Sequence, residues 1–423
     1  MGSVSGDLNT LFSSMALSTV TQCFDAAQKS FATHRKCTEA LAKLRETDPE
    51  SFDNEFFSCV CCILPVGKRE PAIERLVEFV VKFATQHGGE AETDDDFVQG
   101  LVSRLLPLTS ASDKSVRSRA TQLVGRVFNS MSEEAEVSDE LFESVERSML
   151  MRCRDKIPSV RAFAVRALFR LQDPSSRSDE ITSELLRLMA DDASKEVRMA
   201  ALSTIAPSRH AIEAILIRTR DVSAEVRMFA LRVLRDKVEM RWLSISQRTS
   251  LLAGSLLDRD SRVAAVAAEL LTAAWLRKFC EGDVLALLKA LDPVTHDVAA
   301  QNTIAALLQG EAHRPLVAEA AKQWGTLQLE AVYCLRAYVQ ALATASPRAE
   351  EELETVLPTS HDFCEALRRA VAACDEAEGS VDSVRSICCH TRTPAIMKAL
   401  RSLRSSWRLS RSFRVVTIGL VGW

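Results

Sequence analysis

Thirteen lysine and arginine residues in this chain stand where predicted turns meet the starts of helices, a placement that suits binding to phosphate groups. They are Lys68, Arg69, Lys114, Arg117, Arg119, Arg152, Arg154, Lys156, Arg161, Arg166, Lys195, Arg198 and Arg227. Cations that neutralise phosphates release counterions, which gives affinity with a steep salt dependence and little sequence preference. No recognition helix or aromatic stacking pattern for reading bases accompanies them. We therefore predict a non-specific interface for double-stranded DNA.

The densest part of this basic region runs from Arg147 to Arg170. Seven bases in it face a single acid, Asp155; they are Arg147, Arg152, Arg154, Lys156, Arg161, Arg166 and Arg170. Pairing within the stretch cannot balance that excess, so we expect it to be the strongest phosphate-binding segment. The competing interpretation is that each of these side chains is solvated or paired with a neighbouring repeat.

A repeated dipeptide marks the helices that would position these side chains. It occurs a few residues after an aspartate each time, as Val116-Arg117, Val160-Arg161, Val197-Arg198 and Val226-Arg227. The valines are 44, 37 and 29 residues apart, which scatters around the roughly 40-residue length of a HEAT-type repeat. One such hairpin cannot bury its own apolar face and must stack on neighbours. We predict an all-α HEAT-repeat solenoid, a curved superhelix of antiparallel helix pairs in one elongated body.

The residues of the repeated signature have structural roles as well. Asp in the turn is expected to cap the second helix by accepting amide hydrogen bonds. Val is expected to pack inward, and Arg to bridge to the Asp of an adjacent repeat. This ladder competes with phosphate binding for each arginine, although guanidinium edges could stay partly open on the concave side.

Four segments are expected along the chain. Residues 1–20 are predicted to be disordered, and residues 21–345 to form the solenoid. Residues 346–397 are predicted to continue it as divergent helices. Residues 398–423 are interpreted as a basic helix with an apolar tail, of which an aberrant chain end is one explanation.

Apolar residues at helical spacing predict the individual helices of the solenoid. The predicted ranges are 20–44, 53–64, 72–85, 97–106, 116–131, 139–152, 159–171, 178–190, 196–205, 210–218, 224–238, 246–257, 262–276, 283–291, 297–308, 327–345 and 361–375.

A second basic stripe lies near the end of the chain. Its residues follow one another at intervals of 3, 3, 4, 3 and 3, which places them on one helix face: Lys398, Arg401, Arg404, Arg408, Arg411 and Arg414. Such a stripe could bind phosphates or an anionic membrane surface, and a solvated tail is the alternative.

Other classes of function find little support. No apolar run approaches the roughly 20 residues that a membrane span needs, and the N-terminus lacks the pattern of a secretory signal. Cys59, Cys61 and Cys62, and the run Cys388 to His390, lack the paired spacing of a zinc site. No phosphate-cradling glycine loop or catalytic constellation occurs. We expect no cofactor, no metal and no enzymatic activity.

Several strings between the repeats are more specific than the repeat itself. They are Lys68-Arg-Glu-Pro-Ala-Ile-Glu-Arg75, Asp155-Lys-Ile-Pro-Ser-Val-Arg161, Leu171-Gln-Asp-Pro174, Ile205-Ala-Pro-Ser208, Arg218-Thr-Arg-Asp-Val222, Lys237-Val-Glu-Met-Arg-Trp-Leu-Ser-Ile-Ser-Gln-Arg248 and Trp275-Leu-Arg277 with Glu281-Gly282. Together and in this order they resemble the HEAT-repeat subunit 3 of condensin, the chromosome-associated protein G family. The resemblance runs from about residue 25 to about 345 and fades toward 375.

The resemblance implies a non-catalytic regulatory subunit acting in mitotic chromosome condensation. It further implies that the kleisin subunit, chromosome-associated protein H, threads along a groove, and that double-stranded DNA is gripped in the basic concave groove so formed. The SMC ATPase subunits would be indirect partners, and the location would be nucleus and chromosome, with a cytoplasmic pool. Family members are longer, so the chain would carry roughly the N-terminal half.

The alternative is a HEAT-repeat adaptor or scaffold that binds only proteins. Such an adaptor predicts an apolar or acidic inner face and no affinity for duplex DNA.

Overall fold

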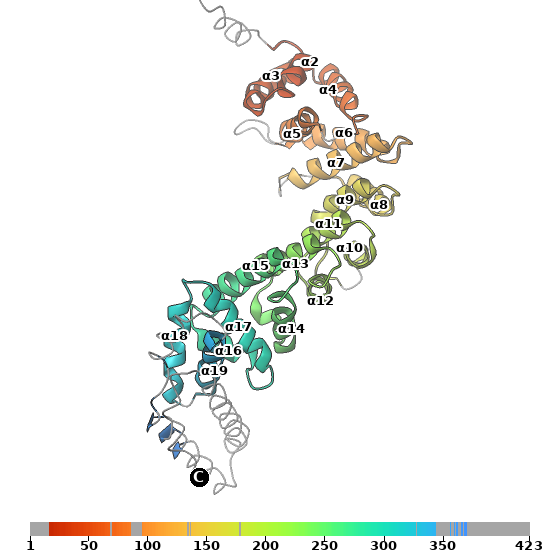
Figure 1. Cartoon of the computed structure of the whole chain (residues 1–423). Helices are drawn as coiled ribbons and strands as arrows, with labels where there is room; N and C mark the ends of the chain where they lie inside the picture. Colours follow the sequence, from red (N-terminus) through yellow and green to blue (C-terminus); the bar gives the residue numbers. More distant parts are fainter. Residues whose placement is uncertain are drawn as a thin grey trace, which may run out of the picture. The chain divides into compact units, whose positions relative to one another are not determined.

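The computed structural model describes residues 17–67, 70–85, 95–132, 135, 137–176, 179–326 and 328–343, with isolated positions between 356 and 369 (Figure 1). All regular structure in these described ranges is helical, as predicted. The contacts divide the chain into two compact units, residues Met1–Ala211 and Ile212–Trp423. Each unit is considered by itself.

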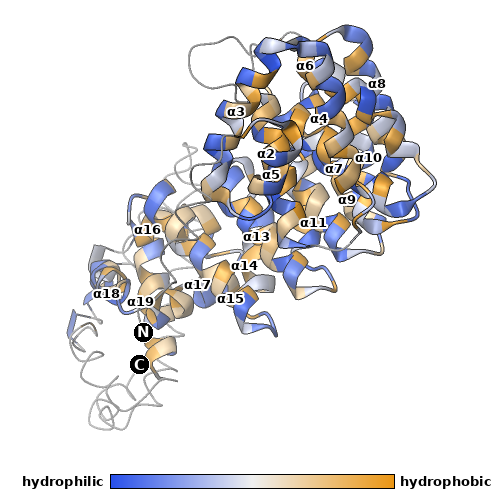
Figure 2. Ribbon diagram, turned by 90° about the horizontal axis from the view of Figure 1, so that it is seen from above, coloured by the Kyte–Doolittle hydropathy of each residue, from blue (hydrophilic) through white to orange (hydrophobic). Residues whose placement is uncertain are grey.

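The first unit is a stack of helical hairpins. Its elements are α2 (Val20–Ala27), η1 (Phe31–Thr33), α3 (His34–Thr47), α4 (Pro49–Ile63), α5 (Pro71–Thr85), α6 (Asp95–Leu105), η2 (Pro107–Ser110), α7 (Lys114–Ser130), α8 (Asp139–Arg152), α9 (Pro158–Ala167), η3 (Leu168–Leu171), α10 (Glu180–Asp191) and α11 (Lys195–Thr204). The second helices of successive hairpins, α5, α7, α9 and α11, pack side by side, and α6, α8 and α10 each cover their partner (Figure 1). Figure 2 shows apolar and polar residues alternating around α7 and α9, as expected for helices that bury one face.

The N-terminal end of the first unit is held together by aromatic side chains. The rings of neighbouring pairs lie 5.1–6.3 Å apart, and they belong to Phe24, Phe52, Phe56, Phe79, Phe83 and Phe97. Most of these pairs are tilted or edge-on, and Phe52 and Phe56 are stacked. Because four helices contribute to this cluster, it fixes α2, α4, α5 and the start of α6 against one another.

The second unit continues the helical pattern. Helix α12 (Arg209–Arg218) begins just before it, and its own elements are α13 (Ala224–Lys237), η4 (Met240–Trp242), α14 (Ile245–Ser255), α15 (Ser261–Glu269), the π-helical η5 (Leu270–Phe279), α16 (Val284–Leu291), α17 (Asp297–Gln309), α18 (Arg314–Lys322), η6 (Gln323–Thr326) and α19 (Leu329–Ala343). Here α13 packs against α15 and η5, while α19 packs against both α17 and α18.

Most predicted helices lie within two residues of the observed ones, and the helix over 139–152 has the predicted ends. One predicted helix was wrong, and one observed helix was missed. The range 20–44 is broken near Ser30, whose side chain accepts the Ala32 amide at 3.2 Å and so starts a new turn. Helix α18 was not predicted, because its buried positions are held by the small or short residues Val317, Ala320 and Ala321.

Predictions for the chain ends fall largely outside the described residues. This applies to residues 1–16, to nearly all of 346–397, and to all of 398–423 with its basic stripe. Within the described part, no helix has the length and apolar character that crossing a membrane requires. No cluster of metal-binding side chains is found there either.

Candidate nucleic-acid interface

The repeated arginines form a ladder between successive turns, as the sequence indicated. Arg117 Nε donates to Asp155 at 3.0 Å, and Arg161 makes a two-pronged contact with Asp192 at 2.7 and 2.8 Å. In the second unit, Arg227 contacts Asp258 in the same two-pronged manner, at 2.8 Å for both nitrogens. Paired, planar contacts of this kind are the strongest that arginine forms with a carboxylate.

Each ladder arginine also closes its own turn. Nη1 of Arg161, Arg198 and Arg227 donates to the carbonyl oxygen six residues earlier, at 2.9, 2.8 and 2.9 Å. That carbonyl belongs to an aspartate in all three repeats. Each of these guanidinium groups therefore bonds to the turn before its own helix. At Arg161 and Arg227 the same group also bonds to the turn of the following repeat.

The turn aspartates order the turn more than they cap the helix. Asp155 and Asp192 accept the amide two residues ahead, at 2.9 and 2.8 Å, which is the N-cap position itself. Burial alone would raise the pKa of Asp155, but the Ile157 amide and the Arg117 guanidinium hold it below its ordinary value. Asp113 is the exception, because it caps α7 directly through the amides of Ser115 and Val116.

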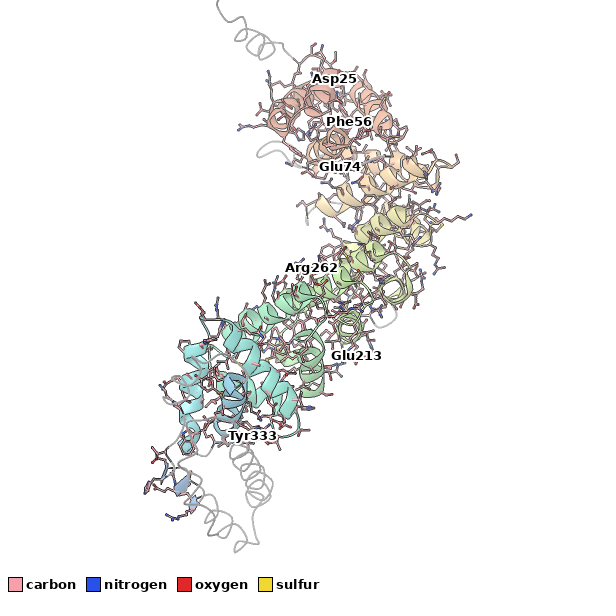
Figure 3. The ribbon with its side chains drawn as sticks, viewed as in Figure 1. Asp25, Phe56, Glu74, Glu213, Arg262 and Tyr333 are labelled. Atoms are coloured by element: carbon pink, nitrogen blue, oxygen red, sulfur yellow. The ribbon has the colours of Figure 1, made fainter. Side chains whose placement is uncertain are left out.

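The ladder removes several arginines from the surface. The side chains of Arg117, Arg161 and Arg227 are only 16, 15 and 6% exposed, and Arg198 is buried as well. Arg119 is 7% exposed for a different reason, since its guanidinium donates to Glu74 at 2.8 Å, to Gln122 at 2.6 Å and to the Val66 carbonyl at 3.3 Å. Figure 3 labels Glu74 on α5.

The stretch from Arg147 to Arg170 corrects one expectation, because internal bonding does engage most of its bases. Arg147 pairs with Glu143 at 3.6 Å and Arg154 with Glu184 at 3.5 Å. Arg152 shares Asp155 with Arg117, at 3.4 Å, and Arg170 donates to the carbonyls of Phe128, Met131 and Ser132. Glu143 and Glu184 lie outside the stretch, so a count of the charges within the stretch left these two acids out.

The lysines behave differently from the arginines. Lys114 and Lys195 are the first residues of α7 and α11, and Lys156 lies two residues before α9; we call these three residues the lysine row. The turns that carry them are neighbours, because the Arg117–Asp155 and Arg161–Asp192 contacts join each turn to the next. Lys114 and Lys156 are exposed and have no ion-pair partner among the described residues, while Lys195 is half-buried.

The remaining predicted DNA-binding residues are exposed, partly exposed or outside the described residues. The Arg154 side chain is 71% exposed despite its contact with Glu184, and Arg166 is exposed with its guanidinium 5.8 Å from the Phe163 ring centre. Arg152 is 19% exposed. Lys68 and Arg69 lie outside the described residues; Gly67 just before them packs so tightly on α7 that a Cβ there would stand 2.5 Å from Ser115 Oγ.

Beside the lysine row lies a hollow of about 320 Å³. Three hydroxyl side chains line it, Ser115, Ser118 and Ser159, and the last two are in contact across the repeats with their oxygens 3.1 Å apart. We call it the serine hollow. The N-cap residues of α9 and α11 make no side-chain capping bond, and the positive ends of these helix dipoles lie at the turns that carry Lys156 and Lys195.

Sequence reasoning missed two exposed arginines on the corresponding turns of the second unit, Arg220 and Arg259. Each is next to a turn aspartate, Asp221 or Asp258, just as Lys156 is next to Asp155. A basic neighbour of the turn aspartate was therefore the signal that could have found them.

Comparison with known proteins identifies relatives of the same kind. No family model matches the chain. It is 36% identical over 355 residues to condensin complex subunit 3 of Xenopus laevis, covering 80% of this chain and 34% of that one. Against condensin complex subunit 3 of Homo sapiens it is 35% identical over 357 residues, covering 81 and 35%.

A solved structure agrees with the fold. The crystal structure of the S. pombe condensin Cnd3–Cnd2 subcomplex matches with a TM-score of 0.76 at 25% identity, covering 92% of this chain and 50% of that chain. The chain spans about a third of the length of the curated relatives that it matches. The relatives are non-catalytic HEAT-repeat subunits, and this chain belongs to their family, condensin complex subunit 3.

Proposed function

We propose that the chain is a regulatory subunit of condensin that binds double-stranded DNA without sequence preference. The observation that carries this proposal is the lysine row. It places three cations on adjacent turns, at or just before the starts of helices, where the positive end of the helix dipole also attracts phosphate oxygens. Exposed Arg154 and Arg166 in the same unit, and Lys68 and Arg69 by their place in the sequence, would add to the interface. The buried ladder arginines would shape the interface and take little direct part in it.

The kleisin subunit is the second proposed partner. Family membership supports this, as does the structural likeness to the Cnd3 component of a Cnd3–Cnd2 subcomplex. Through the kleisin the chain would join the SMC ATPase subunits and act in mitotic chromosome condensation. We also propose a place on chromosomes in the nucleus, which the same membership supports, with a cytoplasmic pool.

The DNA proposal is tested by reversing the lysine row. We expect the combined variant Lys114→Glu, Lys156→Glu and Lys195→Glu to bind a 30-base-pair duplex at least tenfold more weakly at low salt, measured by mobility shift, because phosphates that no lysine neutralises keep their counterions. The matched control is Lys29→Glu, Lys36→Glu and Lys43→Glu, three exposed lysines of α2–α3 and the turn between them with the same change in charge. Equal weakening in both variants would show a general charge effect and would count against the row.

A protein-only adaptor remains the competing function, and one observation favours it. Val222 and Leu257, on adjacent turns of the second unit, are 84 and 71% exposed, a placement suited to a peptide. The adaptor would be favoured if the chain co-purified with the kleisin and the two together showed no measurable affinity for duplex DNA.

A further inference from the structure

One side chain that lines the serine hollow is an aromatic ring, which takes no part in the proposed phosphate contacts. Phe163 of α9 lines it and is half-buried, with the Arg166 guanidinium 5.8 Å from its ring centre. An aromatic ring can stack on any nucleobase, because every base has a π-face. The hydroxyls of Ser115, Ser118 and Ser159 both donate and accept, so they can meet the polar edge of any base.

The charges at the hollow favour a neutral occupant. Arg119 and Glu74 line it together, and they satisfy each other through the 2.8 Å contact between them. A phosphate entering the hollow would meet the Glu74 carboxylate, which is 40% exposed, whereas an uncharged ring would not. The hollow is thus unlike the lysine row beside it, where the side chains are cationic and no carboxylate forms an ion pair with Lys114 or Lys156 among the described residues.

Size and position also suit a base. A volume of about 320 Å³ stands at the small end of ligand pockets, which run from about 300 to 1,000 Å³, and fits one planar ring system better than an extended chain. Ser115 follows Lys114 directly, and Ser159 comes three residues after Lys156. A strand whose phosphates lie on these lysines would therefore run close to two residues of the hollow lining.

We infer that the serine hollow takes a single unpaired nucleobase from DNA bound along the lysine row. This rests on the proposed function, and it adds a preference for duplexes that contain an unpaired nucleotide. Pulling a base out of an intact duplex costs unstacking and unpairing energy, whereas a base already unpaired costs least. Intact duplex would be held by the phosphate contacts of the proposed interface, without the hollow.

The test compares an intact duplex with the same duplex carrying one unpaired nucleotide, by fluorescence anisotropy with the full chain. We expect the second to bind about fivefold more tightly or better, as stacking of one base predicts. Phe163→Leu should abolish that preference and leave the affinity for intact duplex unchanged, and Phe163→Tyr should keep it. Phe169→Leu is the control, since Phe169 is 53% exposed on η3 and is not part of the hollow lining.

A 2-aminopurine at the unpaired position gives an independent signal, because its fluorescence should fall on stacking in the wild type and not in Phe163→Leu. Equal affinity of the wild type for both duplexes would overturn the inference and leave the lysine row standing. Preference retained in Phe163→Leu would also overturn it. Failure to bind either duplex would overturn both proposals.

Discussion

At the scale of single residues, the neighbours of a positively charged side chain decide whether it is bonded inside the stack or exposed at the surface. Arg161 meets Asp192 and two carbonyls inside the stack, while Lys156, five residues earlier, reaches no carboxylate among the described residues. Arginine's planar guanidinium suits several fixed acceptors at once, whereas lysine carries a compact, strongly hydrated charge on a flexible stem. In this repeat the arginine therefore serves cohesion, while Lys156 stays at the surface.

Breaking one ladder contact should destabilise the first unit. Arg161→Met leaves Asp192, whose side chain is 4% exposed, without its cation, and the expected decrease in stability is about 3 kcal/mol. Arg154→Met, which removes a side chain that is 71% exposed, should cost under about 0.5 kcal/mol. The midpoint of urea unfolding followed by circular dichroism measures both, and similar midpoints would contradict the structural role of the ladder.

His34 provides a prediction about pH. Its ring lies between Phe31 and Phe79, Nε2 bonds the Ala27 carbonyl at 3.1 Å, and buried Nδ1 has no partner. Burial lowers its pKa below the ordinary 6.5; the bond to the Ala27 carbonyl and the charge of Glu78 oppose this, while Lys82 and Arg75 lower the pKa further.

Because the folded state disfavours the charged ring, stability should be complete above pH 6.5 and should fall as pH drops below it, with a slope of up to about 1.4 kcal/mol per pH unit. Thermal melts of wild type and His34→Gln between pH 7.5 and 5 check this. Identical pH dependence of the two proteins would exclude His34 as the cause.

At the scale of elements, α7 and α9 approach more closely than two ordinary helices could. A Cβ on Gly125 would stand 2.6 Å from the Ala167 Cβ, so this pair needs a glycine. The close approach brings Ser118 and Ser159 into contact and so forms one wall of the serine hollow. The packing of two helices thus determines the shape of the candidate site.

Gly125→Val should push these helices apart and destabilise the protein by about 1–3 kcal/mol. The control is Gly254→Ala in α14, which is exposed and meets only the Arg220 side chain at 3.7 Å. That change should be neutral or stabilise by up to about 1 kcal/mol, because alanine favours a helix. Melting temperatures that fall equally in both variants would argue against a special requirement at Gly125.

At the scale of the whole chain, local patterns predicted more than charge counts did. The Val-Arg spacing and helical periodicity predicted the hairpins and the ladder, because each depends on residues close in sequence or one repeat away. The pairing of Arg147 and Arg154 depends on acids outside the basic stretch, Glu143 and Glu184, as well as on rotamers. Phe163 was not predicted to bind anything, since only packing places it beside three serines.

The central claim is that the lysine row holds DNA by its phosphates. The most direct measurement is the slope of log affinity for intact duplex against log salt concentration, in wild type and in Lys114→Gln, Lys156→Gln, Lys195→Gln combined. We predict that the slope falls by about 1 for each lysine removed, about 3 in all. An unchanged slope, with both proteins folded, would contradict the account.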